Sequence, residues 1–445
     1  MEKEIATDIV KKLQAAGYIA LFVGGCTRDA LMGIIPKDYD IATNALPDAV
    51  EALFEHTIAI GKSFGVIVVI KGDYSFEVVT LRIDSKNSNG RHPDKVIFTD
   101  SLKEDASRRD FSMNSMYYNP VTTELFDFYG GVYDIEDKII SCVGEASSRF
   151  KEDKLRMLRA IRFATTLGFT IEEYTFNSIP FLSHLIKEVS WERIKMELDK
   201  ILLSSKPSVG FDLLSKSGLL EHILPEIKAL ESTEQSLKWH SEGSTYKHTM
   251  MALDALAELT DDLDMLYGIL LHDVGKAKCT EVINNIIKHP GHDIIGADMA
   301  EDIMIRFKSS TAQKNAVVFL VKEHMRIKSA DKMKKSKLRT LMVHPLFKKL
   351  VMVSEQDSKN AIPADEVDGL HKFDWMDRIK VLQEEVKNEI ILPACLISGK
   401  DLIKCEMIPG PLFSVVLKYV RELQLEGKVD NADEAMQVVK EMINE

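Results

Sequence analysis

The chain has 445 residues, enough for about two to four domains with cores of their own. Hydrophobic residues make up 45% and charged residues 28%, which is typical of a globular protein, and no run of about 18 apolar residues offers a membrane span. The net charge of −12 gives no sign of nucleic-acid binding by the chain as a whole, although a local basic groove is compatible with it.

The cysteines and the N-terminus predict a cytoplasmic location. The first 18 residues are charged and amphipathic, without the apolar core of a secretory signal. The cysteines are five in number, are far apart and form no CxxC pair, so neither a disulfide framework nor a zinc knuckle is expected. They are Cys26, Cys142, Cys279, Cys395 and Cys405.

The first 82 residues predict a helix followed by short strands. Apolar side chains at helical spacing indicate an amphipathic helix over residues 3–16. Runs of β-branched and other apolar residues then predict strands at 19–24, 39–42, 64–70 and 75–82.

A glycine turn follows the first strand. Gly24 and Gly25 allow a close backbone approach to a ligand, and the amides of such a turn can cradle phosphate oxygens. Arg28 and Asp29 follow directly. The turn therefore predicts a phosphate-binding site.

Three carboxylates are expected near that turn. Asp38 and Asp40 are two residues apart and project to the same side of a strand, where they repel each other unless a cation lies between them. Glu77, flanked by apolar residues on another strand, is a candidate third acid, although an exposed edge glutamate is an equally good account of it alone. Hard oxygen ligands favour Mg²⁺, so the pattern predicts metal-dependent nucleotide chemistry.

The next stretch offers guanidinium groups. Residues 84–95 are polar and predict a loop, after which Arg108, Arg109 and Asp110 follow in a row. Guanidinium forks bind triphosphates well, although a surface RRD is commonly no more than a solvated face. Residues 126–140 predict a strand, a Gly-Gly turn and a second strand.

From about residue 147 the pattern becomes helical. The first long helix is expected over 150–169, closed by Gly168. Glu152, Asp153 and Arg156 are spaced so that the arginine shares a helix face with both acids. Such a triplet is either an ordinary ion pair or a base reader, because a carboxylate and a guanidinium together match the pairing edges of cytosine and adenine.

A polar stretch at about 228–246 suggests a domain boundary, beyond which lies a second set of candidate ligands. Histidine and aspartate residues recur on expected helices, which is typical of a metal site in an all-helical domain. The basic run 332–339 is as compatible with a solvated helix face as with RNA contact, and residues 370–445 are again helical, with SGKDLI and IPGPLF as turns. The six candidate ligands are His248, His272, Asp273, His292, His324 and Asp357.

Taken in order, these motifs resemble those of the class II tRNA nucleotidyltransferase and bacterial poly(A) polymerase family over nearly the full chain. The motifs GGCTRD with DYD, RRDFSMNSM, DFYGGVYDIEDKII and EDKLRMLRAIRFA resemble four family motifs in their family order. The HD segment and the SGKDLI/PGP tail resemble the HD-containing bacterial branch. Lys154 stands where proline is common in the family, Ser115 where alanine is common, and Cys405-Glu406 where a hydrophobic-Gly pair is usual.

The resemblance implies roles for individual residues. Asp38 and Asp40 would hold Mg²⁺, with Glu77 as the third catalytic acid. Asp153 and Arg156 would read the base, supported by Glu152 and Arg159. The full set of implied nucleotide-binding residues is Gly24, Gly25, Arg28, Asp29, Arg108, Arg109, Asp110, Asn114, Glu152, Asp153, Arg156, Arg159 and Arg162.

The resemblance also implies an α+β architecture in four parts. A nucleotidyltransferase head of the DNA polymerase beta type, with a mixed sheet and helices, is expected over 1–145. An all-α neck follows over 146–230, an HD-type helical domain over 240–365 and a helical tRNA-binding tail over 370–445.

The activity implied first is CCA addition, with CMP and AMP taken from CTP and ATP and joined to the tRNA 3′ end without a template. The segment 82–93 has the full length seen in CCA-adding members rather than the shortened form of CC-adding ones, which disfavours addition of CC alone. Addition of A alone and poly(A) synthesis remain alternatives. A rival of another class is a metal-dependent phosphohydrolase centred on His272 and Asp273, with a second divalent metal. No membrane partner is expected.

Overall fold

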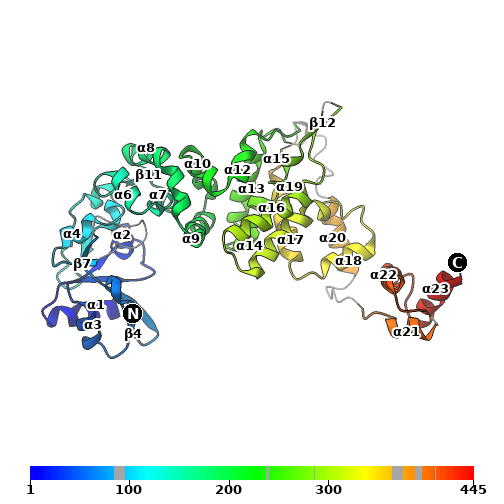
Figure 1. The fold of residues 1–445 in the computed structure, drawn as a ribbon, viewed down its shortest axis with the longest axis horizontal. Coiled ribbons are helices and arrows are strands. Elements are labelled where there is room, and N and C mark those ends of the chain that lie inside the picture. Colours follow the sequence, from blue (N-terminus) through cyan, green and yellow to red (C-terminus); the bar gives the residue numbers. More distant parts are fainter. Residues whose placement is uncertain are drawn as a thin grey trace. The chain divides into compact units, whose positions relative to one another are not determined.

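The structure is a computed structural model that describes residues 1–84, 96–236, 240–284, 286–362, 374–385, 393–405 and 407–444. The chain divides into two compact units, Met1–Lys228 and Ala229–Glu445 (Figure 1). None of the helices in these ranges combines the length and apolar character that a bilayer crossing needs. The architecture is α+β, as predicted, with a mixed sheet at the N-terminus and helices after it.

The first unit begins with a seven-stranded sheet in the order β3-β4-β5-β2-β1-β8-β9. The strands pair antiparallel except for β2 and β5, which run parallel. The predicted helix and four predicted strands are confirmed within two residues at each end. The elements are α1 (Glu2–Ala15), β1 (Ala20–Val23), α2 (Gly25–Leu31), β2 (Asp40–Thr43), α3 (Pro47–Leu53), β3 (Thr57–Gly61), η1 (Lys62–Phe64), β4 (Val66–Lys71), β5 (Tyr74–Thr80), β6 (Arg82–Asp84), β7 (Val96–Phe98), α4 (Leu102–Ser107), η2 (Ser112–Asn114), β8 (Tyr117–Tyr118), β9 (Leu125–Phe126) and α5 (Gly131–Glu136).

Side chains alternate between two cores on opposite faces of this sheet. Phe22 and Ile41 pack with α1 and α3, which lie together in Figure 1. Val23 and Ala42, next to them in the chain, pack on the opposite face with Tyr117. Because side chains on a strand alternate with period two, Asp40 shares the face of Ala42, away from α1 and α3.

The prediction for 126–140 is partly wrong. Residues after the Gly-Gly turn form the helix α5 before the short strand β10 (Ile139–Ile140). Gly131 packs against the backbone of Ser112, where an added Cβ would lie 2.5 Å from the carbonyl oxygen, so close approach explains the glycine.

The helical remainder of the first unit also contains a short parallel strand pair, β10 with β11, so that it is not purely α. The long helix expected over 150–169 is two helices, because α6 ends at Glu152 and Asp153 adopts an extended backbone before α7 begins. Gly168 closes α7 in the left-handed conformation, as predicted. The elements are α6 (Ala146–Glu152), α7 (Leu155–Leu167), β11 (Thr170–Ile171), α8 (Glu173–Leu182), η3 (Ser183–Glu188), α9 (Trp191–Leu202), α10 (Pro207–Lys216), α11 (Leu220–Ile223) and α12 (Pro225–Ala229).

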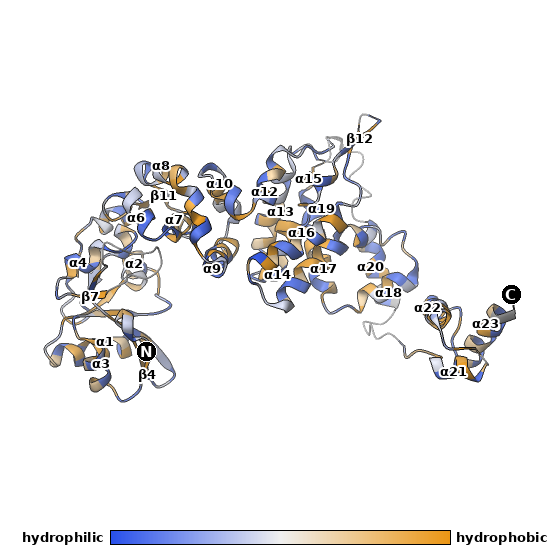
Figure 2. Ribbon diagram, in the orientation of Figure 1, coloured by the Kyte–Doolittle hydropathy of each residue, from blue (hydrophilic) through white to orange (hydrophobic). Residues whose placement is uncertain are grey.

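In its described residues the second unit is helical apart from one hairpin, β12 with β13. Helices α13, α14, α16, α17 and α19 pack on one another. In Figure 2 hydrophilic and hydrophobic residues mix along α16 and α17, as amphipathic packing requires, whereas α14 is buried from Met265 to Leu271. The elements are η4 (Leu230–Ser232), α13 (Thr245–Ala257), α14 (Leu263–Leu271), α15 (Lys276–Cys279), β12 (Glu281–Ile283), β13 (Ile286–Lys288), α16 (His292–Arg306), α17 (Thr311–Ile327), α18 (Lys335–Met342), α19 (Phe347–Asn360), α20 (Asp374–Glu385), α21 (Gly399–Lys404), α22 (Pro411–Glu426) and α23 (Ala432–Asn444).

The tail corrects one expected turn. SGKDLI is mostly helix α21, which Ser398 begins through a capping box with Asp401. IPGPLF leads into α22, with Pro411 as the first helical residue. Glu406, in the segment that departs from the family pattern, lies outside the described residues, as does most of the expected loop 84–95.

Candidate functional site

The three predicted carboxylates lie together on the face of the sheet that faces away from α1 and α3. The parallel register pairs Ile41 with Val78, so the preceding residues, Asp40 and Glu77, lie side by side. Asp38 is exposed two residues before Asp40, and the intervening Tyr39 is buried. The alternation predicted from the sequence is therefore present.

The ionisation of Asp40 shows how unfavourable this grouping is without a cation. The pKa of the Asp40 carboxyl is raised to about 6, chiefly by burial and then by the charges of Glu77 and Asp38, with Arg109 opposing them. Carboxylates that repel each other at close range are a fitting donor set for a divalent ion.

The pKa of Asp40 predicts how stability depends on pH. The pKa of Asp40 in the folded protein lies above the usual 3.8. The protonated carboxyl therefore contributes its full share to the free energy of unfolding below about pH 3.8, and this contribution is lost as the pH rises through about 6. Asp40→Asn should therefore raise the free energy of unfolding at pH 8 in EDTA by on the order of 1–2 kcal/mol. Thermal denaturation at pH 8 and pH 5 checks this, because an equal gain at both values would contradict it.

The glycine turn lies against these acids. Gly24 has a φ of 75°, and a Cβ built on it would lie 3.9 Å from Oδ2 of Asp40 and 3.8 Å from Nη1 of Arg109. Arg28 donates to Asn114 at 2.8 Å and pairs with Asp29 at 2.6 Å. The first and second predicted nucleotide motifs therefore meet at one place.

The RRD motif connects the sheet to the helices that follow. Asp110 is buried and accepts from Arg159 at 2.5 and 2.8 Å. Burial would raise the pKa of Asp110, but the Arg159 guanidinium outweighs it and holds the pKa at about 2. Asn114 donates to the other oxygen of Asp110 at 3.2 Å. Asp110 is thus a permanent anion that fixes Arg159 on α7.

The helix face expected to carry Glu152, Asp153 and Arg156 together is only partly present. Arg156 pairs with Glu152 at 3.0 Å, whereas Asp153 pairs with Arg193 of α9 at 2.8 Å. The reason is the break between α6 and α7, where Asp153 turns to accept from the amide of Leu155. Arg156 and Asp153 therefore lie near each other in the chain without sharing an ion pair.

Several residues that form ion pairs with the predicted site residues could not be identified from the sequence. Arg162 donates to Glu197 of α9 at 2.8 Å and stacks on Phe163. Arg193 and Glu197 are not adjacent to any motif, so only the fold reveals them. Asp105, by contrast, lies three and four residues before Arg108 and Arg109, a helical spacing that could have predicted its ion pairs with both.

The second unit gathers all six predicted ligands, and all six are buried. They come from α13, α16, α17, α19 and the residues directly after α14. Their ligand atoms form two groups, one of His248, His272 and Asp357 and the other of Asp273, His292 and His324, each within 4.8 Å. His240 and Glu242, which were not predicted from the sequence, form a further group with His248.

Three of these histidines have the geometry of metal ligands. Nδ1 of His272, His292 and His324 lies 2.6–2.8 Å from a backbone carbonyl oxygen and so carries the proton. Each Nε2 is buried without a hydrogen bond and lies 3.1–4.0 Å from a carboxylate oxygen of Asp273. Burial lowers the pKa of His292 and His324, whereas Asp273 and Asp357 outweigh burial at His272 and raise its pKa to about 10. Positive charge is therefore favoured at this centre, and these residues fit a divalent metal.

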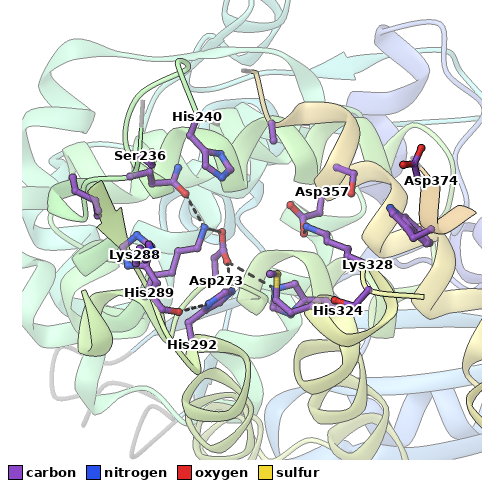
Figure 3. A pocket seen from close by; sticks show the side chains of 18 of the residues that line it. Ser236, His240, Asp273, Lys288, His289, His292, His324, Lys328, Asp357 and Asp374 are labelled. Atoms are coloured by element: carbon purple, nitrogen blue, oxygen red, sulfur yellow. Dashed lines mark hydrogen bonds and ion pairs between the residues drawn. The ribbon is translucent and has the colours of Figure 1, made fainter. Parts of the chain in front are cut away.

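Asp273, His292, His324 and Asp357 border a cavity of about 940 Å³. Lys276 pairs with Asp273 at 2.7 Å. Lys328 pairs with Asp357, and Figure 3 shows these two side chains next to each other. Figure 3 also shows Asp273, His292 and His324 converging, with Lys288 and His289 at one side. Lysines beside a metal-ligand cluster are suited to an anionic, phosphate-bearing ligand.

Comparisons with known families match most of the chain. The Poly A polymerase head domain matches residues 20–141, and the "probable RNA and SrmB-binding site of polymerase A" matches 168–231. The HD domain matches 245–372.

Curated relatives agree. A CCA-adding enzyme of Limosilactobacillus reuteri (strain DSM 20016) is 35% identical over 254 residues, which are 56% of this chain and 62% of the relative. That of Geobacillus thermodenitrificans (strain NG80-2) is 41% identical over 218 residues, which are 49% and 54%. The match thus spans less than two thirds of the length of these relatives.

Solved structures extend the likeness to nearly the full chain. The crystal structure of the Bacillus stearothermophilus CCA-adding enzyme in complex with CTP covers 99% of this chain and 98% of its own, with a TM-score of 0.69 and 25% identity. Motif order, domain matches and this likeness agree: the chain combines a Poly A polymerase head domain, a polymerase A RNA-binding segment and an HD domain, and it is similar over nearly its full length to a CCA-adding enzyme.

Proposed function

We propose that the chain adds nucleotides to the 3′ end of tRNA, joining CMP and AMP from CTP and ATP without a template. The observation that carries this proposal is the meeting of Asp38, Asp40 and Glu77 beside the Gly24 turn and Nη1 of Arg109. The names of the relatives and the CTP complex of the structural neighbour support it.

The reaction follows from this arrangement. The RNA 3′-hydroxyl attacks the α-phosphorus of the NTP, and pyrophosphate leaves. The family implies a divalent metal, and Asp38, Asp40 and Glu77 would hold Mg²⁺ in a two-metal arrangement. When bound there, Mg²⁺ lowers the pKa of the 3′-hydroxyl and stabilises the leaving pyrophosphate. Arg28 and Arg109 bind phosphate oxygens, while Asp110 holds Arg159 in place.

Base choice is assigned to the residues at the break between α6 and α7. Arg156 reaches Glu152, and it also donates to the carbonyl oxygen of Arg108 at 2.5 Å, so its guanidinium links this break to the RRD motif. Asp153, held by Arg193, supplies the carboxylate. Together they would accept from the exocyclic amine and donate to the ring nitrogen of cytosine or adenine.

Arg156→Ala should relax base choice. Losing one charge-assisted hydrogen bond to the ring nitrogen should raise incorporation of UTP and GTP relative to CTP and ATP by about tenfold. Single-nucleotide incorporation with each NTP measures this, with the exposed Lys151→Ala as a control on α6. Continued exclusion of UTP and GTP in the Arg156 variant would show that the base is read elsewhere.

The product is tested directly by one assay. tRNAs that lack all, two or one of the terminal CCA nucleotides are incubated with each NTP, and the added nucleotides are read on a gel. Extension of all three substrates supports CCA addition, extension of the last alone supports A-only addition, and long A tracts support poly(A) synthesis. The segment 85–95, which bears on this choice, lies outside the described residues.

We also propose a second activity, metal-dependent hydrolysis of phosphate esters at the HD centre. The buried Nε2 atoms that face Asp273, together with Lys276 and Lys328 at the cavity, favour it. Release of phosphate from nucleotides or 2′,3′-cyclic nucleotides that survives Asp38→Ala would support it. We further propose that the chain is built from four parts, which are residues 1–145, 146–230, 240–365 and 370–445, and that the protein is cytoplasmic.

A further inference from the structure

One buried carboxylate, on the face of the sheet that carries Val23, Ala42 and Tyr117, accepts hydrogen bonds from several partners. Asp105 of α4 is 1% exposed. Its Oδ1 accepts from Nε of Arg108 at 2.9 Å and from the amide of Arg82 at 3.1 Å. Its Oδ2 accepts from Nη2 of Arg109 at 3.0 Å and from the hydroxyl of Tyr117 at 2.6 Å. A single carboxylate therefore holds both arginines of the RRD motif.

This anchoring leaves one end of Arg109 directed at the glycine turn. Nε and Nη2 of Arg109 both donate to Asp105, and the guanidinium lies over the Tyr117 ring, 5.4 Å from its centre. The remaining Nη1 is the atom that lies 3.8 Å from a Cβ built on Gly24. A guanidinium fixed along one edge presents its free edge in a defined direction.

The second partner of Asp105 is tied to the same place by strand register. Tyr117 on β8 pairs with Val23 on β1, and Val23 pairs with Asp40 on β2. Val23, the middle residue of the row Tyr117–Val23–Asp40, directly precedes Gly24. The hydrogen bond from Tyr117 to Asp105 therefore fixes Arg109 relative to the strands that carry the acids and the turn.

We propose that Asp105 and Tyr117 are positioning residues for the triphosphate, holding Arg109 so that Nη1 meets a phosphate oxygen above the Gly24 turn. This inference rests on the proposed nucleotidyl transfer. The two residues touch no reacting atom and act through Arg109. A role in folding alone would affect every substrate equally, whereas positioning affects the groups that Arg109 binds.

Two variants test the proposal. Tyr117→Phe removes only the hydroxyl, and Asp105→Asn removes the charge that both guanidiniums share. Tyr117→Phe should raise KM for CTP and Ki for pyrophosphate by about tenfold, and Asp105→Asn should raise them further, with KM for tRNA unchanged. Glu104→Gln, an exposed acid next to Asp105 on α4, is the matched control and should change none of these constants.

The outcomes separate the two proposals. If the wild-type protein incorporates no nucleotide, the proposed transfer fails, and calorimetric Kd values for pyrophosphate in the wild type and Tyr117→Phe still test the positioning. Equal Kd or Ki values in wild type and Tyr117→Phe, or a parallel rise of KM for tRNA, would overturn the inference. Should Asp105→Asn not fold, Tyr117→Phe decides alone.

Discussion

Replacing Asp40 by asparagine is expected to reduce nucleotide incorporation by at least about a thousandfold, because the variant loses the carboxylate that is placed between Asp38 and Glu77 for divalent-metal binding. The same change removes a carboxyl group whose pKa is raised to about 6, chiefly by burial. The folded protein should therefore become more stable at neutral pH while activity is lost. Loss of activity with a gain in stability is the reverse of what damage to the core would produce.

Labelled CTP or ATP incorporation and thermal denaturation measure the two effects on the same preparation. Asp73→Asn serves as the control, because Asp73 is an exposed acid between β4 and β5 and should leave both quantities unchanged. Retention of incorporation in Asp40→Asn would remove Asp40 from the catalytic residues.

The second large effect is expected in the other unit. Asp273→Asn should abolish metal binding at the HD centre and reduce phosphate-ester hydrolysis by about a hundredfold or more, while leaving nucleotide incorporation unchanged. Asp273 lies close to three histidine Nε2 atoms and pairs with Lys276, so the centre loses its shared carboxylate.

Metal content after dialysis against Mn²⁺ gives a measurement that does not depend on any substrate. Asp298→Asn, an exposed acid on α16, is the matched control. If hydrolysis survived Asp273→Asn and disappeared with Asp38→Ala, the phosphate would come from the head, and the proposal for the HD centre would be wrong.

The positions of the acids were predictable from the sequence because strand geometry leaves little choice. Asp38 and Asp40 alternate with the buried Tyr39 and Ile41, and period two alone directs the acids to one side. That Glu77 lies beside Asp40 was a weaker expectation, since it depends on the parallel pairing of β2 with β5, which no local signal specifies.

The error at Glu152–Arg156 has a local cause. The spacing predicted one continuous helix, but Asp153 is a favoured helix-capping residue and accepts from the amide of Leu155, which ends one helix and starts another. Its ion partner Arg193 lies 40 residues away on α9, beyond the reach of any short-range pattern.

In the second unit, ligand types were predictable but their grouping was not. Histidine and aspartate residues at helical segments indicated a metal site, whereas the division into two groups depends on how five helices pack. His240 and Glu242 lie before the first of these helices, in a stretch interpreted as a domain boundary.

Gly275, two residues after Asp273, shows how that packing is achieved. A Cβ built on it would lie 2.1 Å from the carbonyl oxygen of His292 and 2.7 Å from the amide of Gly296. The main chain after α14 thus touches the first turn of α16, and that contact brings Asp273 up to His292. Transplanting the histidines and aspartates onto another helical scaffold would fail unless this side-chain-free crossing were transplanted with them, so an engineer should begin from the glycine.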